Sequence, residues 1–160
     1  MKTWLCLFVS VAFVACDQKP KEVTGYQGKF LEEAAILNAY TTQGVNFDTF
    51  SDQLARTKAA FELEKTWPDA MQKTVFADAV NAWSLAHLVW RVEIQGRSEL
   101  DPQYKPHAEL IAEVREMCHV ENPKSRSMVQ TRDLVRQALG HAGRQFESGR
   151  DRSWLALKRE

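Results

Sequence analysis

Apolar side chains recur at every third or fourth position through most of residues 29–160, which is the spacing of one face of an α-helix. The segment that follows Pro68 shows this pattern over the longest run. Its stripe consists of Phe76, Val80, Trp83, His87, Trp90 and Ile94, and neighbouring apolar residues widen it. A helix with so much apolar surface is normally surrounded by other helices. We therefore expect this segment to be the central helix of an all-α bundle.

Four other segments carry the same helical spacing, and turn signals separate them. We expect one helix over residues 29–43, ending before Gly44, and another over residues 47–67, where Asn46 is suited to cap the first turn. Two more are expected over residues 106–119 and 127–149. We find no convincing strand pattern. The chain is thus predicted to form an irregular bundle of about five helices in one domain, residues 29–160.

Two local features bear on how these helices begin and pack. Thr66 and Asp69 have the spacing of a capping box, which favours a new helix there, and the alternative is one long helix kinked at Pro68. Gly140 and Gly143 lie inside the last helix, where each glycine costs about 1 kcal/mol relative to alanine. We expect close packing against a neighbouring helix to compensate for these two glycines.

The first residues of the chain have the character of an export signal. Lys2 is followed by an uncharged run from Thr3 to Cys16. As a helix this run would rise about 21 Å, whereas the hydrocarbon core of a bilayer is roughly 30 Å thick. The run is therefore short for a membrane span but suits the apolar region of a signal peptide. Ordinary cleavage after Ala15 is disfavoured, because bulky Phe13 stands where a small residue is needed.

Phe13, Val14, Ala15 and Cys16 resemble the lipobox of bacterial lipoproteins, although Phe13 replaces the usual leucine. The resemblance covers residues 1–16 alone and implies that residues 1–15 are a lipoprotein signal peptide. Cys16 would then carry a diacylglyceryl group and become the N-terminus, anchored in the cell envelope and facing the periplasm. The alternatives are an uncleaved anchor or plain secretion. Asp17 resembles the inner-membrane retention signal of enteric lipoproteins, so the inner membrane is slightly favoured.

Residues 17–28 are polar, contain Pro20 and two glycines, and lack helical periodicity. This composition predicts a flexible spacer with a root-mean-square reach of about 20 Å. The organisation that follows is a signal peptide over 1–15, a lipidated cysteine and flexible tether over 16–28, and the helical domain. The chain carries 21 basic and 21 acidic residues, so its overall charge gives no reason to expect a nucleic-acid partner.

Residues able to carry chemistry are sparse in the helical domain. The four histidines are scattered at positions 87, 107, 119 and 141, and we predict neither a metal site nor a cofactor. Met117, Cys118 and His119 are adjacent, and adjacent helical side chains point about 100° apart rather than toward one ion. Cys118 shares a stripe with apolar residues, so burial is expected. We find no nucleophile, phosphate-loop or dinucleotide motif, and we predict that the chain is not an enzyme.

These observations favour a lipid-tethered domain that binds a protein, comparable to immunity, exclusion or envelope-adaptor lipoproteins. The partner-binding candidates are Arg97 and Tyr104, which lie in the longest predicted loop and are residue types that often anchor interfaces. Another interpretation of this loop is that Leu100 and Tyr104 close the end of the bundle while Arg97 stays solvated.

The alternative function is the binding of a small ligand or cofactor. In that interpretation Trp83, His87 and Trp90 form one wall of a pocket on the central helix. Helical bundles do bind haem through a core histidine. A histidine that is simply hydrogen-bonded within the core is nevertheless the more common arrangement.

Overall fold

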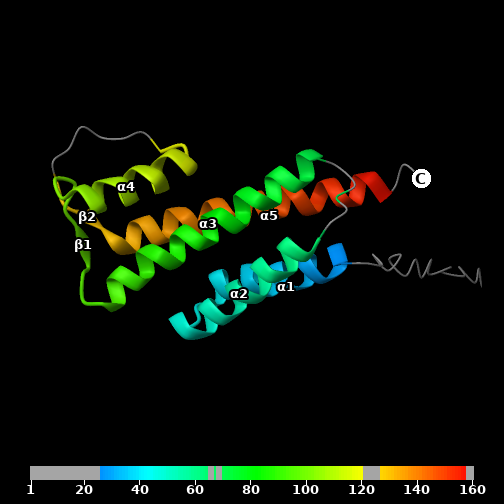
Figure 1. Cartoon of the computed structure of the whole chain (residues 1–160), viewed down its shortest axis with the longest axis horizontal. Helices are drawn as coiled ribbons and strands as arrows, with labels where there is room; N and C mark the ends of the chain where they lie inside the picture. Colours follow the sequence, from blue (N-terminus) through cyan, green and yellow to red (C-terminus); the bar gives the residue numbers. More distant parts are fainter. Residues whose placement is uncertain (1–25, 65–66, 68–69, 121–126, 158–160) are drawn as a thin grey trace, which may run out of the picture.

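Five helices and one small antiparallel sheet of two strands make up the part of the chain that the computed structural model describes, residues 26–64, 67, 70–120 and 127–157. The elements are α1 (Tyr26–Gln43), α2 (Phe47–Leu63), α3 (Ala70–Ile94), β1 (Glu99–Leu100), α4 (Lys105–Met117), β2 (Val129–Gln130) and α5 (Thr131–Leu157). The predicted all-α bundle of about five helices is confirmed (Figure 1). Cys16, residues 17–25 of the expected flexible spacer and the proposed capping box of Thr66 and Asp69 lie outside the described residues. The spacer was expected to reach residue 28, and this bound is wrong, because α1 already begins at Tyr26.

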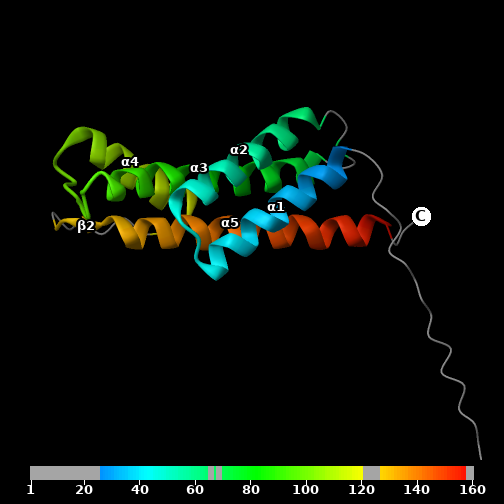
Figure 2. The same cartoon turned by 90° about the horizontal axis from the view of Figure 1, so that it is seen from below.

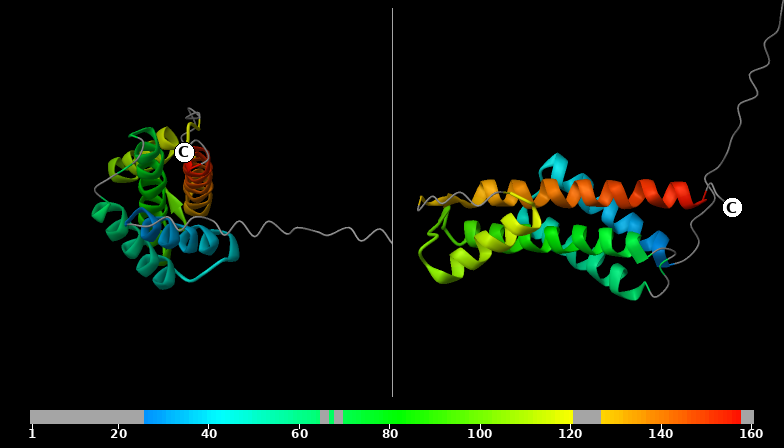
Figure 3. Two further views of the ribbon diagram at one scale, coloured as in Figure 1. Left: turned by 90° about the vertical axis from the view of Figure 1, so that its right-hand side faces the viewer. Right: turned by 90° about the horizontal axis from the view of Figure 1, so that it is seen from above.

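The two longest helices, α3 and α5, run antiparallel along the whole molecule and share its most extensive interface (Figures 1 and 2). The hairpin of α1 and α2 packs against one half of this pair, and α4 packs against the other half (Figure 3). The start of α1 and the end of α5 lie at the same end of the bundle, opposite the two strands. The central position expected for residues 70–94 is therefore correct.

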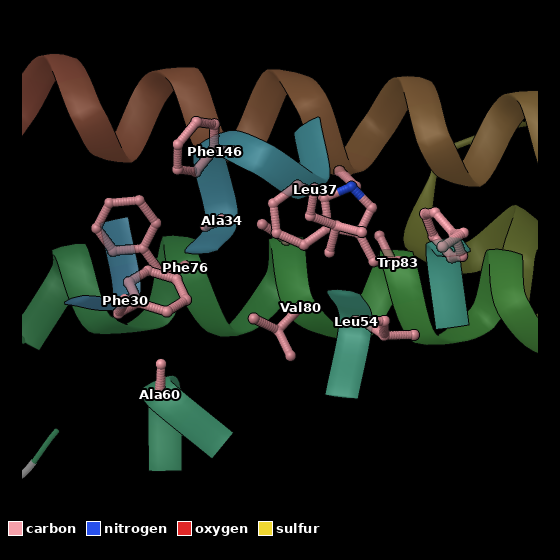
Figure 4. Packing of buried hydrophobic residues seen from close by; sticks show 13 residues of the cluster. Phe30, Ala34, Leu37, Leu54, Ala60, Phe76, Val80, Trp83 and Phe146 are labelled. Carbon is pink, nitrogen blue, oxygen red and sulfur yellow. The ribbon is translucent and has the colours of Figure 1, made fainter. Parts of the chain in front are cut away.

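The hydrophobic core divides into two clusters that follow this arrangement. The first lies under α1 and α2 and is built mainly from aromatic rings, among them Phe30, Phe76, Trp83 and Phe146 (Figure 4). Its rings meet edge to face or tilted, with centroids 5.1 Å apart for Phe30 and Phe76, which are favourable arrangements for aromatic pairs. The second lies under α4 and is mostly aliphatic. Both clusters draw residues from α3 and α5.

The buried face of α3 differs from the stripe expected from the sequence. Phe76, Val80 and Trp83 are buried as predicted, but Trp90 is half-buried and Ile94 is 55% exposed. The second half of the helix instead buries small and aliphatic residues, namely Ala82, Leu85, Ala86 and Val89. The second half of α3 packs against α4 and α5, which lie on a different side of the helix from α2. The buried face of α3 therefore changes direction along its length.

Local signals account for most of the helix ends. Asn46 caps α2, because its side-chain Oδ1 accepts a hydrogen bond from the backbone N–H of Thr49 at 2.8 Å. Gly44 and Gly96 follow α1 and α3 with φ angles of +74° and +90°, a conformation that side chains disfavour. The expected boundaries at Gly44 and Asn46 are confirmed.

The pairing of β1 with β2 was not anticipated from the sequence. Glu99 and Leu100 face Gln130 and Val129 in antiparallel register, and both the N–H and the hydroxyl of Thr131 donate to the Ser98 carbonyl at 3.0 Å. Strands of two residues carry no alternating pattern, so no local signal marks them. Because residues 129–130 are extended, α5 begins at Thr131 rather than at residue 127. None of the described helices is long and apolar enough to cross a membrane.

Candidate functional site

A groove of about 700 Å³ runs along the outer face of α5, next to the C-terminal end of α1. We call it the α1–α5 groove, and the described residues that line it come from these two helices. α1 contributes Asn38, Thr41 and Thr42, and α5 contributes Arg132, Val135, Arg136, Leu139, Gly140, Gly143, Arg144 and Glu147. The surface is apolar along its length and bordered by hydroxyl, amide and guanidinium groups.

The groove exists because of the spacing of residues along α5. Positions 132, 136, 140 and 144 are four residues apart, and positions 135, 139 and 143 interleave with them, so all lie on one face of the helix. From Arg132 to Glu147 this face extends about 22 Å. Val135 and Leu139 are half-buried, while the arginines are exposed. One helix thus presents an apolar strip with a cationic border.

The two helices touch at one end of the groove. An added Cβ at Gly143 would lie 3.1 Å from the Asn38 side-chain oxygen. The Asn38 amide donates a hydrogen bond of 3.1 Å to Glu147, which also pairs with Arg150. Close packing against a neighbouring helix, expected at Gly143, is therefore confirmed. Beyond this contact α1 and α5 separate and the groove opens.

Gly140 does not follow the same expectation. Among the described residues outside its own helix backbone, an added Cβ at this position would meet only the Arg144 guanidinium, at 3.5 Å, and no atom of a neighbouring described helix lies within 4 Å. The close contact that sequence reasoning missed is instead at Gly149, where a Cβ would lie 2.5 Å from a ring carbon of Phe76. Gly140 thus leaves space on the groove surface rather than allowing two helices to meet.

The charges along the groove are predominantly positive. Arg132 lies 3.9 Å from Glu93 and Arg136 lies 3.6 Å from Asp133, and all but Glu93 among these side chains are well exposed. Exposed ion pairs of this kind contribute little free energy and exchange partners readily. Among the described side chains, Arg144 has no carboxylate within salt-bridge distance. The groove is consequently suited to negatively charged groups.

The partner-binding candidates Arg97 and Tyr104 lie at the end of the bundle that carries the strands. Both contact His107: the ring centroids of Tyr104 and His107 are 4.8 Å apart, and Arg97 Nη1 lies 3.2 Å from His107 Nε2. His107 Nδ1 accepts from the Asp101 N–H, so Nε2 carries the proton and cannot accept a hydrogen bond from Arg97. Both candidates are exposed, and Arg97 is only weakly held.

The other interpretation of this loop is correct in part. Leu100 is fully buried in the second cluster and closes the end of the bundle. Tyr104 is 53% exposed and does not take part in that closure. The structure therefore separates a packing role for Leu100 from two exposed side chains that remain candidates for contact with a partner.

The ligand-pocket candidates are packed among rings of neighbouring helices. Trp83 is fully buried, and its ring centroid is 5.9 Å from that of Phe146. His87 stacks on Phe47 at 4.8 Å, and its Nε2 lies 3.1 Å from the Ser51 hydroxyl. Burial, followed by the charges of nearby basic side chains, lowers the pKa of His87. Trp90 contacts Phe47 and Phe50. None of the three candidates lines the α1–α5 groove.

The sulfur and imidazole groups near the end of α4 come closer together than their sequence positions suggested. The rings of His119 and His141 are 6.1 Å apart, and His119 has a φ of 53° where α4 ends. Cys118 is half-buried, and burial raises the pKa of its thiol. Burial and then the charge of Arg144 lower the pKa of His141. Among the described residues, no three metal-ligating side chains converge.

The sequence did contain a signal for the groove. Arginines at positions 132, 136 and 144, with Gly140 between them, form a series with a spacing of four residues. This series marks one face of a helix, but the place where α1 ends beside it is set by the tertiary fold.

Comparisons of the chain with protein-family models, with curated proteins and with solved structures find no match.

Proposed function

We propose that this chain is a membrane-tethered periplasmic lipoprotein whose helical domain binds a protein. The lipobox-like residues 13–16 and the polar stretch after them support the tether. The single observation that supports protein binding is the α1–α5 groove, which offers apolar and cationic surface along about four turns of α5.

The form of the groove favours a macromolecular partner over a small ligand. Sites for small molecules usually enclose most of the ligand surface. The described lining of this groove comes from α1 and α5 alone, so a small molecule would be covered on one side. A helix or an extended segment of another protein can instead lie along it, in the manner of helix-in-groove recognition.

The arrangement of the domain is compatible with a tether at Cys16. The start of α1 and the end of α5 lie at one end of the bundle, whereas β1, β2 and the loop with Arg97 and Tyr104 lie at the other (Figure 1). A lipid anchor before α1 would hold the first end near the bilayer. The opposite end would then face the periplasm, and a partner would have access to Arg97 and Tyr104.

The tether is tested by replacing Cys16 with serine, with Cys118→Ser as the matched cysteine variant. We expect Cys16→Ser to leave the membrane fraction and to lose the mass of the acyl chains, because no other residue of the motif can be lipidated. Cys118→Ser should fractionate like the unaltered protein. An unmodified N-terminus together with unchanged membrane association of Cys16→Ser would contradict this half of the proposal.

Protein binding is tested by photo-crosslinking in intact cells. A photoreactive residue is placed at Thr42 beside the groove, at Tyr104 at the far end, or at the exposed Arg56 of α2 as a control. We expect a defined protein adduct from Thr42 or Tyr104 and none from Arg56. If neither of the first two positions yields a protein adduct, the domain does not act as a protein-binding module.

A further inference from the structure

We propose that the α1–α5 groove receives an acidic amphipathic helix of the partner protein. This inference rests on the proposed function and specifies the chemistry of the partner. Three features carry it: the unfilled space at Gly140, the positive charge along the border, and the length and one-sided shape of the groove.

Gly140 is the first feature. A glycine in the middle of a helix lowers stability by about 1 kcal/mol relative to alanine, and at Gly143 and Gly149 tight contacts within the fold explain the small residue. At Gly140 the nearest atom to an added Cβ belongs to the mobile end of an arginine. The fold itself therefore gives no reason for a glycine here. A partner segment that lies directly on the backbone of α5 would explain the glycine, because a larger side chain at position 140 would hold that segment away from the helix.

The charge of the border is the second feature. Among the described residues, Arg132, Arg136 and Arg144 line the groove against one carboxylate, Glu147, and that carboxylate is already engaged by Asn38 and Arg150. Arg144 is without a carboxylate partner among the described side chains, and the pairs of Arg132 and Arg136 are long and exposed. Glutamate or aspartate side chains of a partner would complement this border.

The shape is the third feature. Val135 and Leu139 provide half-buried apolar surface between the arginines, with Thr41 and Thr42 on the opposite side. The Thr41 and Thr42 hydroxyls donate to carbonyls of their own helix and can still accept hydrogen bonds. The groove face of α5, about 22 Å long from Arg132 to Glu147, matches four turns of a helix, and its apolar residues occupy the middle of that length, from Val135 to Gly143. An occupant with apolar residues at positions i, i+3, i+4 and i+7 and carboxylates beside them fits each part of this surface.

The test uses the full-length protein in detergent micelles and three labelled peptides of about 18 residues, each about 27 Å long as a helix. The peptides share one leucine stripe, and their polar face carries glutamate, glutamine or lysine. We expect the glutamate peptide to bind about tenfold more tightly than the lysine peptide. Added salt screens the charges, so the ratio of the two affinities should become smaller as the salt concentration rises. Fluorescence anisotropy measures the affinities.

Two variants alter the groove in different ways. Arg136→Glu combined with Arg144→Glu reverses the border charge and should reverse the preference between the glutamate and lysine peptides. Gly140→Trp places a large side chain in this space and should weaken binding of the glutamate peptide by about tenfold or more. Arg56→Glu, an exposed charge reversal on α2, should leave every affinity unchanged. Circular dichroism verifies that each variant retains its helical content.

Several outcomes would overturn the inference. These are equal binding of the glutamate and lysine peptides, no binding of any peptide, or affinities that neither groove variant changes. If the groove variants alter only the oligomeric mass of the protein, a second copy of the chain occupies the groove instead. Failure of this inference is distinct from failure of the proposed function. If the crosslinking experiment gives protein adducts at Tyr104 and none at Thr42, the domain still binds a protein, but through the end that carries the strands and not through the groove.

Discussion

The two alanine substitutions Gly149→Ala and Gly140→Ala, made in the same helix, should differ clearly in their effect on the free energy of unfolding. Each replaces a helical glycine, so each gains about 1 kcal/mol of helix propensity. At Gly140 no clash with the described residues opposes this gain, because the new methyl group meets only the Arg144 guanidinium, at 3.5 Å. We therefore expect Gly140→Ala to raise the free energy of unfolding by about 1 kcal/mol.

At Gly149 the new methyl group would overlap with Phe76. Three ring carbons of Phe76 lie 2.5, 2.8 and 2.9 Å from the Cβ position, and carbon atoms in contact are normally about 3.5–4.0 Å apart. The ring must move by about 1 Å, yet Phe76 is fully buried and is surrounded by Phe30, Trp67 and Phe146. Overpacking of this kind costs about 1–3 kcal/mol. The gain in helix propensity is common to both variants, so the free energy of unfolding of Gly149→Ala should be about 1–3 kcal/mol lower than that of Gly140→Ala.

Urea unfolding followed by circular dichroism measures the difference. A separation of about 2 kcal/mol corresponds to a shift of roughly 1 M in the midpoint for a domain of this size. Phe76→Leu should relieve the overlap, so the penalty at Gly149 should be smaller in the Phe76→Leu background than in the unaltered protein. Equal stabilities of the two alanine variants would refute the packing of α5 against α3 described here.

Three further predictions concern single side chains. Asn46→Ala should lower the free energy of unfolding by about 1 kcal/mol, because the N–H of Thr49 loses its acceptor. Asn46→Asp keeps an acceptor for this N–H and should be as stable as the unaltered protein. If Asn46→Ala is also as stable as the unaltered protein, Asn46 does not cap α2. Burial and the charge of Arg144 lower the pKa of His141 in the folded protein, so protonation of His141 favours the unfolded chain. The free energy of unfolding should therefore decrease as the pH drops below the ordinary histidine pKa of 6.5. Urea midpoints measured at pH about 7.5 and 5.5 should show this decrease, and the decrease should be smaller in His141→Gln. The thiol of Cys118 is half-buried with a raised pKa, so maleimide should label it more slowly in the native than in the urea-unfolded protein, and equal rates would contradict its placement.

Helix existence and helix ends were predictable because they depend on neighbours in the sequence. Gly44 and Asn46 act within one turn, and their roles are the same in the structure as in the sequence. The direction of the buried face of α3 was less predictable. Its second half packs against α4 and α5, so Ala86 is buried and Ile94 is exposed, although hydrophobicity alone would rank them in the reverse order.

The candidate site was predictable only in part. The spacing of Arg132, Arg136 and Arg144 identifies one helical face from the sequence alone. A groove additionally requires that α1 end beside this face, which follows from the contact between Asn38 and Gly143, more than a hundred positions apart in the chain. Arg97 and Tyr104 were selected by residue type and loop length, and the structure adds that both are exposed beside His107.

The position of α5 at the end of the described chain has a consequence for how the protein matures. α5 supplies Ala142 and Phe146 to the first cluster and Leu134 and Ala138 to the second. Helices α1 to α4 therefore have incomplete apolar surfaces until residues 131–157 have left the ribosome. During that interval contacts between distant parts of the chain cannot form, which slows folding and exposes apolar surface. Helices α1 to α4 cannot complete either cluster by themselves, so folding of the domain depends on α5.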